Sequence, residues 1–286
     1  MAGTPPKKHH YVPRMLLRRF ADNDGRFYHF SRHQPEVCHR HFSNVFYQNH
    51  LYALPPVDGA RDLSVERQLA HIEDVVSPIL DRLEPPLLGG FRPDLARIER
   101  EALCLFLYEQ WRRVPDFHDE IMPEERSRAV LEKAISDFEI AHRPLTADER
   151  KGYLGRDALR EIRQRVRVQS LAAASRRVIE IINSKGLWFA LTPARKSFLI
   201  SSYPVVKIVP SGIENELHNP QVELWLPIHP RIMMIFAGAE GGGVVTLLEK
   251  QVRDYNLVVA RRSGEFASLS KDLVASIART CGRSSL

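Results

Sequence analysis

Cysteine is scarce in this chain of 286 residues, which contains only Cys38, Cys104 and Cys281, all far apart. A sparse, odd set of cysteines argues against a disulfide framework and favours a reducing compartment. Long apolar runs are also missing: none approaches the roughly 18 residues of a membrane span, and the first residues contain no apolar stretch of a signal peptide. We therefore expect a cytoplasmic protein with no membrane partner.

The motifs that identify the commonest enzymes are absent as well. The sequence has no GxxxxGK[ST] phosphate loop, no GxGxxG fingerprint, no nucleophile elbow and no HExxH zinc motif. The run Gly241–Gly243 accordingly predicts a tight connection rather than a phosphate loop. Common kinases, dehydrogenases and hydrolases thus have no positive support.

What the chain does contain is ordinary globular composition with a basic balance. Hydrophobic residues make up 44% and charged residues 27%, and the formal net charge is +6. This composition is typical of a chain that folds around a core. The charge is compatible with an anionic partner such as nucleic acid or a nucleotide, but many proteins with this balance bind no polyanion.

The periodicity changes twice along the chain. Alternation predicts a hairpin from residues 26–30 and 36–42, and helical spacing predicts helices over 64–83, 94–113, 124–141 and 147–184. We expect the first of these to stop at Pro85-Pro86 and the last to break near Gly152 or Gly155. After Leu187 the sequence predicts short strands at 188–191, 198–200, 205–209, 222–226 and 232–237, a helix over 246–259, and a final short strand and helix.

This order predicts an α+β fold with an N-terminal β-hairpin region, a central helical bundle and a C-terminal small mixed sheet with a helix. We expect one compact unit over residues 1–286. Its subregions are the N-terminal motif and hairpin (1–62), the helical part (63–186) and the strand-rich part (187–286).

Potential chemistry is most concentrated in the segment that begins at His9 and His10. Pro13 favours an extended conformation before it and suits the first turn of a helix, so we expect a strand leading into a helix over 14–20. Adjacent side chains on an extended segment point to opposite faces, so at most one histidine is expected to face any single pocket. Imidazole there can act as acid, base or metal ligand. The alternative is a histidine that orders the segment by bonding a backbone group.

Carboxylates at helical spacing are the next candidates. Glu66 and Glu73 are seven residues apart and share one helical stripe, where they can bind a divalent cation or act as acid and base; the alternative is a boundary pair bridged to arginines. Glu109 lies on the apolar face of its helix and is expected to be paired with Arg112 or Arg113. Alternatively, Glu109, Gln110 and Arg113 line a polar cleft.

Basic residues form two groups that could contact phosphate. The first accompanies the histidines, and the second is a helical stripe with spacings of four, three and four. They are Lys8, Arg14 and Arg18, and then Arg156, Arg160, Arg163 and Arg167. Such a stripe is the expected footprint of a polyanion. A solvated helix face is the alternative.

Histidines are also frequent in the predicted hairpin. If the hairpin forms, His39 and His41 share a face and His29 can lie across from them, which is one conceivable metal site. Surface histidines are the alternative. The identity of any metal is unknown from sequence, although a divalent ion is compatible with the carboxylates, and no other cofactor is indicated.

Taken together, these landmarks resemble an uncharacterised family, the domain of unknown function 4238. The HHxVPxxxLRxF opening of that family is similar to His9, His10, Val12, Pro13, Leu17, Arg18 and Phe20, and its ExxLxxxE helix is similar to Glu66, Leu69 and Glu73. Later landmarks that resemble it are Arg113-Val114-Pro115, Ser201-Ser202-Tyr203-Pro204, Leu226-Pro227-Ile228-His229-Pro230 and Asn256. One departure is that Ser202-Tyr203 replaces the Asp-Asn of the family pattern, so any role of that Asp is missing here.

Three functional hypotheses follow. The first is a nuclease or other phosphodiester-acting enzyme, with His9 or His10 as base or metal ligand, Glu66 and Glu73 as acidic partners, and Arg113 with the N-terminal cations as a phosphate clamp. The second is a non-catalytic nucleic-acid or nucleotide-binding module. The third is a structural or partner-binding protein. Whether the protein is an enzyme, its substrate and its oligomeric state are open from sequence.

Overall fold

The structure of the chain, a computed structural model, describes residues 8–54 and 62–282. The helices are α1 (Arg14–Arg19), α2 (Ser64–Leu88), α3 (Arg97–Arg112), α4 (Pro115–Ile121), α5 (Glu124–Ala141), α6 (Ala147–Tyr153), α7 (Arg156–Ala172), α8 (Arg176–Asn183), α9 (Glu249–Arg262) and α10 (Lys271–Gly282), with a 3-10 turn η1 (Phe42–Asn44). The strands are β1 (Lys8–His10), β2 (Arg26–Ser31), β3 (Gln34–His41), β4 (Tyr47–Asn49), β5 (Gly186–Leu191), β6 (Ile200–Ser201), β7 (Val206–Ile208), β8 (Glu223–His229), β9 (Ile232–Ala237), β10 (Gly242–Thr246) and β11 (Glu265–Ser268). The predicted α+β class is confirmed.

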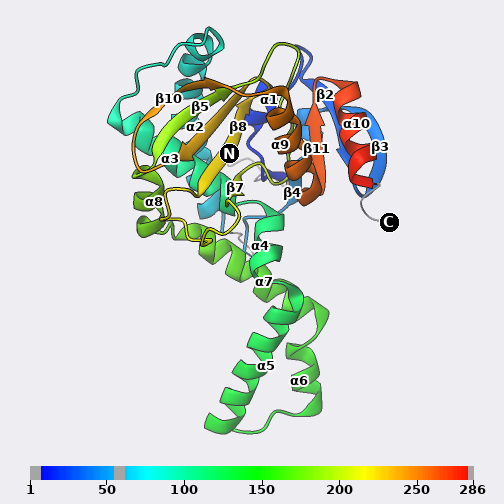
Figure 1. Ribbon diagram of the computed structural model, residues 1–286. Helices are drawn as coiled ribbons and strands as arrows, with labels where there is room; N and C mark the ends of the chain where they lie inside the picture. The colour runs from blue at the N-terminus through cyan, green and yellow to red at the C-terminus, as the bar shows by residue number, and fades with distance from the viewer. Residues whose placement is uncertain (1–7, 55–61, 283–286) are drawn as a thin grey trace, which may run out of the picture.

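Three sheets organise these strands. A five-stranded sheet has the order β10-β5-β9-β8-β7, in which only the β10–β5 pair is parallel, and it is the predicted C-terminal mixed sheet. A four-stranded sheet, β3-β2-β11-β6, joins the predicted hairpin to the C-terminal strand β11. The third sheet is the β1–β4 pair. In Figure 1, α10 lies beside the sheet of β2, β3 and β11.

The prediction of a tight connection at Gly241–Gly243 is wrong for most of that run. Gly242 and Gly243 belong to β10, and Gly242 pairs with Leu187 of β5. A Cβ atom on Gly242 would lie 2.3 Å from the carbonyl oxygen of Leu187. Glycine is therefore required here because the two backbones approach more closely than a side chain allows.

The end of one predicted helix differs from the prediction, and one further helix was not predicted. The expected stop at Pro85-Pro86 is wrong, because α2 runs through both prolines to Leu88. Leu83 and Leu87 are fully buried on its last two turns. Their burial compensates for the backbone hydrogen bonds that proline cannot donate. Beyond α3, Pro115 opens a new helix, α4, as a proline in the first turn does.

The predicted helix over 147–184 is three helices. It breaks at Leu154 and Gly155, as expected, and again between Ala173 and Ser175, which was not predicted. Figure 1 shows α5 and α6 projecting together as an arm from the rest of the molecule, with α7 leading back toward it.

The N-terminal segment is anchored in the largest hydrophobic core. Val12, Leu16, Leu17 and Phe20 are all fully buried there, together with residues of α2 and α3. Because these side chains are buried in the core, the short helix α1 is held firmly in place. The two histidines just before it are consequently fixed relative to α2 and α3.

The idea of a metal site built from His29, His39 and His41 is wrong. Hairpin register pairs His29 with Cys38, so His29 and His39 point to opposite faces of the sheet. His39 lies near Asp22, and His41 bonds to Ser43. Across the described residues, no group of three or more His, Cys, Asp or Glu side chains is arranged to hold a metal ion.

Candidate functional site

The two adjacent histidines lie on a short strand that pairs with a later segment. His9 pairs with Gln48 and His10 with Tyr47 across the β1–β4 ladder. Alternation along β1 buries the His9 side chain completely and leaves that of His10 half-buried. The prediction that the two histidines face different surroundings therefore agrees with the observed strand.

His9 is held inside the fold. Its Nδ1 accepts a hydrogen bond from the backbone N–H of Tyr52 at 3.1 Å, and its ring stacks on the Tyr52 ring with centroids 5.6 Å apart. The His50 ring meets it edge-on at 6.3 Å. Because Nδ1 is an acceptor, it has no proton to give to Glu66, whose Oε2 lies 3.7 Å away. His9 thus orders the segment.

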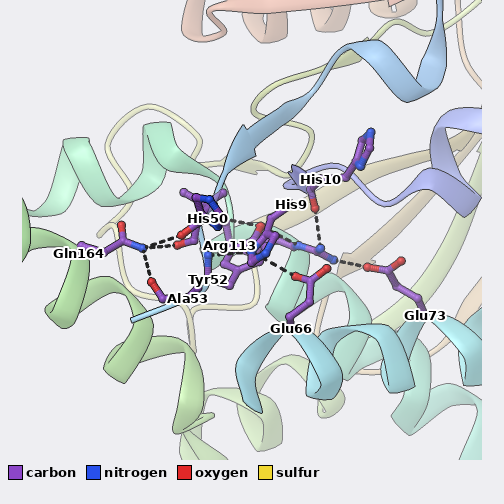
Figure 2. Close-up of polar contacts among 10 residues, drawn as sticks. His9, His10, His50, Tyr52, Ala53, Glu66, Glu73, Arg113 and Gln164 are labelled. Carbon is purple, nitrogen blue, oxygen red and sulfur yellow. Dashed lines mark hydrogen bonds and ion pairs between the residues drawn. The ribbon is translucent and has the colours of Figure 1, made fainter. Parts of the chain in front are cut away.

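His10 lines a pocket of about 550 Å³, which we call the His10 pocket. Of the residues proposed from sequence, the pocket wall contains Lys8, His10, Arg14, Glu66, Glu73 and Arg113. They come from β1, α1, α2 and the end of α3. Figure 2 shows the His10 ring turned away from the cluster of Glu66, Glu73 and Arg113, while its backbone carbonyl faces Arg113.

Arg113 connects the elements that form this wall. Its Nη1 lies 2.6 Å from Glu73 Oε1, and its Nη2 donates to the carbonyl of His10 at 2.7 Å. Its Nε donates to the Tyr52 hydroxyl at 3.2 Å. Only 4% of Arg113 is exposed, so these bonds satisfy a charge that would otherwise be costly to bury. Arg112, its neighbour, makes the internal pair with Glu109 at 2.7 Å, as one of the two expected pairings.

The pKa values of His10 and Glu66, both in the pocket wall, are shifted. Burial, and next the charge of Arg14, lower the pKa of His10 to about 4. Burial also raises the pKa of the Glu66 carboxyl, with Arg113 acting against that rise. At neutral pH the imidazole is therefore uncharged, and the carboxyl holds a proton more readily than an ordinary glutamate.

The stripe on α7 does not converge on the His10 pocket. Its four arginines line a separate pocket of about 940 Å³, the α7 pocket, together with Asp119, Glu124, Asp157 and Glu161. The stripe consists of Arg156, Arg160, Arg163 and Arg167. Asp119 lies 2.6 Å from Arg163 and 3.6 Å from Arg167. Acidic residues thus offset much of the positive charge expected for a polyanion footprint. Arg18, on α1, lies with Arg14 over the Phe42 ring.

Two residues of this region were missed from sequence. Tyr52 stacks on His9 and accepts a hydrogen bond from Arg113. The only feature of the sequence that pointed to it was the aromatic-rich segment around it. Gln164 donates to the carbonyls of His50, Leu51 and Ala53 at 3.1, 2.7 and 3.2 Å, and so holds the turn after β4 (Figure 2). The only feature of the sequence that pointed to Gln164 was its position within the arginine stripe, four residues after Arg160.

The position where the family pattern has Asp also has a distinct environment. Ser202 donates to Asp116 Oδ2 at 2.9 Å and accepts from the backbone N–H of Gly264. A carboxylate from α4 therefore lies beside this serine. Burial raises the pKa of Asp116, with Ser202 and Gly264 acting against that rise.

Comparison with protein families gives one match. The sequence profile of a family described as a protein of unknown function, DUF4238, matches residues 8–271. The chain belongs to the DUF4238 family. This confirms the resemblance predicted from sequence. Comparison of this DUF4238 protein with curated proteins and with solved structures gave no match. None of the helices in its described part combines the length and apolar character needed to cross a bilayer.

Proposed function

We propose that this DUF4238 protein is a hydrolase that acts on phosphodiesters in the His10 pocket. The observation that carries the proposal is the presence of His10, Glu66, Glu73 and Arg113 in the wall of one pocket. These residues lie up to 103 positions apart in the sequence. A neutral imidazole, a protonatable carboxyl and fixed cations are the groups that phosphoryl transfer uses.

His10 serves as the general base. It takes a proton from the attacking water, whose oxygen forms the new bond to phosphorus. An uncharged imidazole can accept this proton at neutral pH. A bound phosphate offsets the positive charges of Arg14, Arg113 and Lys8, which are among the causes that lower the pKa of His10. Substrate binding therefore makes His10 a stronger base.

Glu66 serves as the general acid. It donates a proton to the oxygen that leaves as the phosphorus–oxygen bond breaks. Glu66 Oε2 is buried without a hydrogen bond to any described residue, which favours the protonated form. Glu73 has a different task, because it is paired with Arg113 and fixes the position of that guanidinium.

Lys8 and Arg14 bind the phosphate oxygens. Neither forms an ion pair with an acidic side chain in the described part of the chain; Lys8 bonds Asn44 at 3.3 Å and Arg14 lies over Phe42. Their charges are therefore not neutralised by any described carboxylate. Arg113 contributes a third, immobile positive charge at the pocket wall.

The test uses the purified full chain with bis(p-nitrophenyl) phosphate and with single-stranded RNA and DNA, in EDTA and with added divalent metal. We expect His10→Gln and Glu66→Gln to lower kcat by about 100-fold, as removal of a general base or acid does. The matched control is Arg165→Gln, an exposed arginine on α7 paired with Glu161. Wild-type turnover in His10→Gln would refute the assignment of the base.

The non-catalytic nucleic-acid-binding alternative is favoured by the same unneutralised cations, Lys8, Arg14 and Arg18. It predicts that single strands bind with a steep salt dependence while none of the phosphodiesters is hydrolysed. Equilibrium binding measured beside the turnover assay separates the two functions.

A further inference from the structure

A second pocket adjoins the His10 pocket. It has a volume of about 400 Å³, and its wall contains His29, Arg40, Asn44, Phe46, Tyr47 and Glu265. We call it the His29 pocket. Asn44 lines both pockets, so the two recesses meet at the η1 turn.

The ridge between the two pockets is formed by Asn44, Tyr47 and Lys8. Lys8 Nζ donates to Asn44 Oδ1 at 3.3 Å and lies 4.4 Å from the centre of the Tyr47 ring. Tyr47 lines the His29 pocket, yet its ring is 5.7 Å from that of His10. The ammonium group of Lys8 therefore lies on the path of any ligand that enters both pockets.

Glu265 fixes the His29 ring in the wall of the His29 pocket. Oε2 of Glu265 lies 2.5 Å from His29 Nε2, and Oε1 accepts from the Tyr11 hydroxyl and from the Phe46 N–H. These three contacts occupy both oxygens of the carboxylate. His29 Nδ1 has no hydrogen-bond partner among the described residues, and His29 lines the pocket. That nitrogen can thus bond a ligand.

The wall of this pocket includes a strained residue. Phe46 has φ of +54°, which is rare for a bulky side chain. Its ring is buried against Phe27 and His29, and its N–H is bonded to Glu265. Such conformations persist where the surroundings enforce them, and they concentrate at functional sites.

An arginine without an ion pair in the described chain lies on each side of the ridge. Arg40 in the His29 pocket and Arg14 in the His10 pocket have no acidic partner within residues 8–54 and 62–282. On α7, Arg163 and Arg167 lie against Asp119, and although Arg156 and Arg160 form no ion pair among the described residues, they share the α7 pocket with four acidic residues. An anionic ligand is therefore expected at the ridge rather than along α7.

We propose that the ligand is a single strand of nucleic acid that crosses the Asn44 ridge, with one phosphate in the His10 pocket and the next against Arg40. This inference rests on the proposed function and extends it to a substrate class. Two adjoining recesses, each with an arginine that lacks a described ion-pair partner, suit a ligand with repeated charges better than a mononucleotide. A duplex is too stiff to bend into both recesses, whereas a single strand bends freely and can stack a base on Tyr47.

The experiment measures fluorescence anisotropy of a labelled single strand of about 12 nucleotides over a series of salt concentrations. Each phosphate contact contributes about 0.7 to the slope of log K against log salt. We expect Arg14→Gln and Arg40→Gln each to reduce the slope by about 0.7 and the double variant by about 1.4, while Arg40→Lys retains it. Arg165→Gln is the control and leaves the slope unchanged. Arg40 is exposed, so its variants are expected to fold.

The readout needs no turnover, so the two proposals can fail separately. An unchanged slope in Arg40→Gln, or equal binding of the duplex of the same sequence, would overturn the single-strand assignment even if diesters are hydrolysed. Loss of slope in both variants without hydrolysis of any diester would support the strand path and overturn the proposed hydrolase.

Discussion

Arg113 Nη2 donates a hydrogen bond of 2.7 Å to the backbone carbonyl of His10. This bond joins the end of α3 to β1, and the same guanidinium holds Glu73 of α2. One buried side chain thus fixes three elements of the His10 pocket.

Replacing Arg113 tests that role. Arg113→Met keeps most of the volume but leaves Glu73 and the His10 carbonyl without their donor, while the Tyr52 hydroxyl keeps only the backbone carbonyl of residue 113. We expect the free energy of unfolding to fall by about 3 kcal/mol, as it does when one member of a buried pair is removed. Urea denaturation measures this change. Arg165→Met, whose pair with Glu161 is half-exposed, is expected to change it by about 0.5 kcal/mol or less.

The two histidines are expected to differ in their effect on stability. His9→Ala removes a fully buried ring and leaves the Tyr52 N–H without an acceptor, so we expect a loss of about 2–3 kcal/mol in the free energy of unfolding. His10→Ala is expected to cost about 1 kcal/mol or less, because its ring borders a pocket. Thermal and urea unfolding of both variants measure the difference. Equal losses would contradict the assignment of His9 as the residue that orders the segment.

The pH dependence of stability should report on His10. Its pKa is about 4 in the folded protein and near the ordinary 6.5 in the unfolded chain, so the unfolded chain binds more protons between these values. The contribution of His10 to the free energy of unfolding therefore rises as pH increases from about 4 to about 6.5. His10→Gln removes this contribution, and urea unfolding at several pH values measures the loss. His71→Gln, an exposed site on α2, is the control and is expected to keep the wild-type pH profile.

Gly242 tests the packing of β10 on β5, and Gly152 in α6 serves as the comparison. Gly242→Ala places a Cβ against the Leu187 carbonyl, so we expect a loss of about 2 kcal/mol or more in the free energy of unfolding. Gly152→Ala meets no atom within 4 Å and lies in α6, so it is expected to stabilise by about 0.5 kcal/mol. Opposite signs for the two variants in thermal unfolding would agree with this account.

Local patterns were sufficient to predict most elements of the fold. The helical spacing in α5 and the alternation in β2 depend only on near neighbours, and both were predicted nearly to the residue. The course of α2 through Pro85-Pro86 was not, because burial of Leu87 against residues distant in sequence outweighs the local preference of proline. Strand β10 was missed for a similar reason, since its pairing with β5 joins segments about 55 residues apart.

The residues of the candidate site also differ in whether local sequence could predict them. Spacing brought Glu66 and Glu73 onto one face, and Pro13 implied an extended strand before it. The contacts of Tyr52, Gln164 and Glu265 could not be predicted, because their partners come from other parts of the chain. The division of residues 1–286 into one unit with three subregions, and the location expected from the cysteine content, stay predictions.

Glu265 lies 254 positions after the Tyr11 that donates to it. A ribosome therefore completes the histidine-bearing segment long before it makes the carboxylate that fixes Tyr11, His29 and Phe46. Until Glu265 has been made, the N–H of the strained Phe46 lacks its carboxylate acceptor. The wall of the His29 pocket therefore cannot form in a shorter nascent chain. It matures only after β11 has been synthesised and enters its sheet.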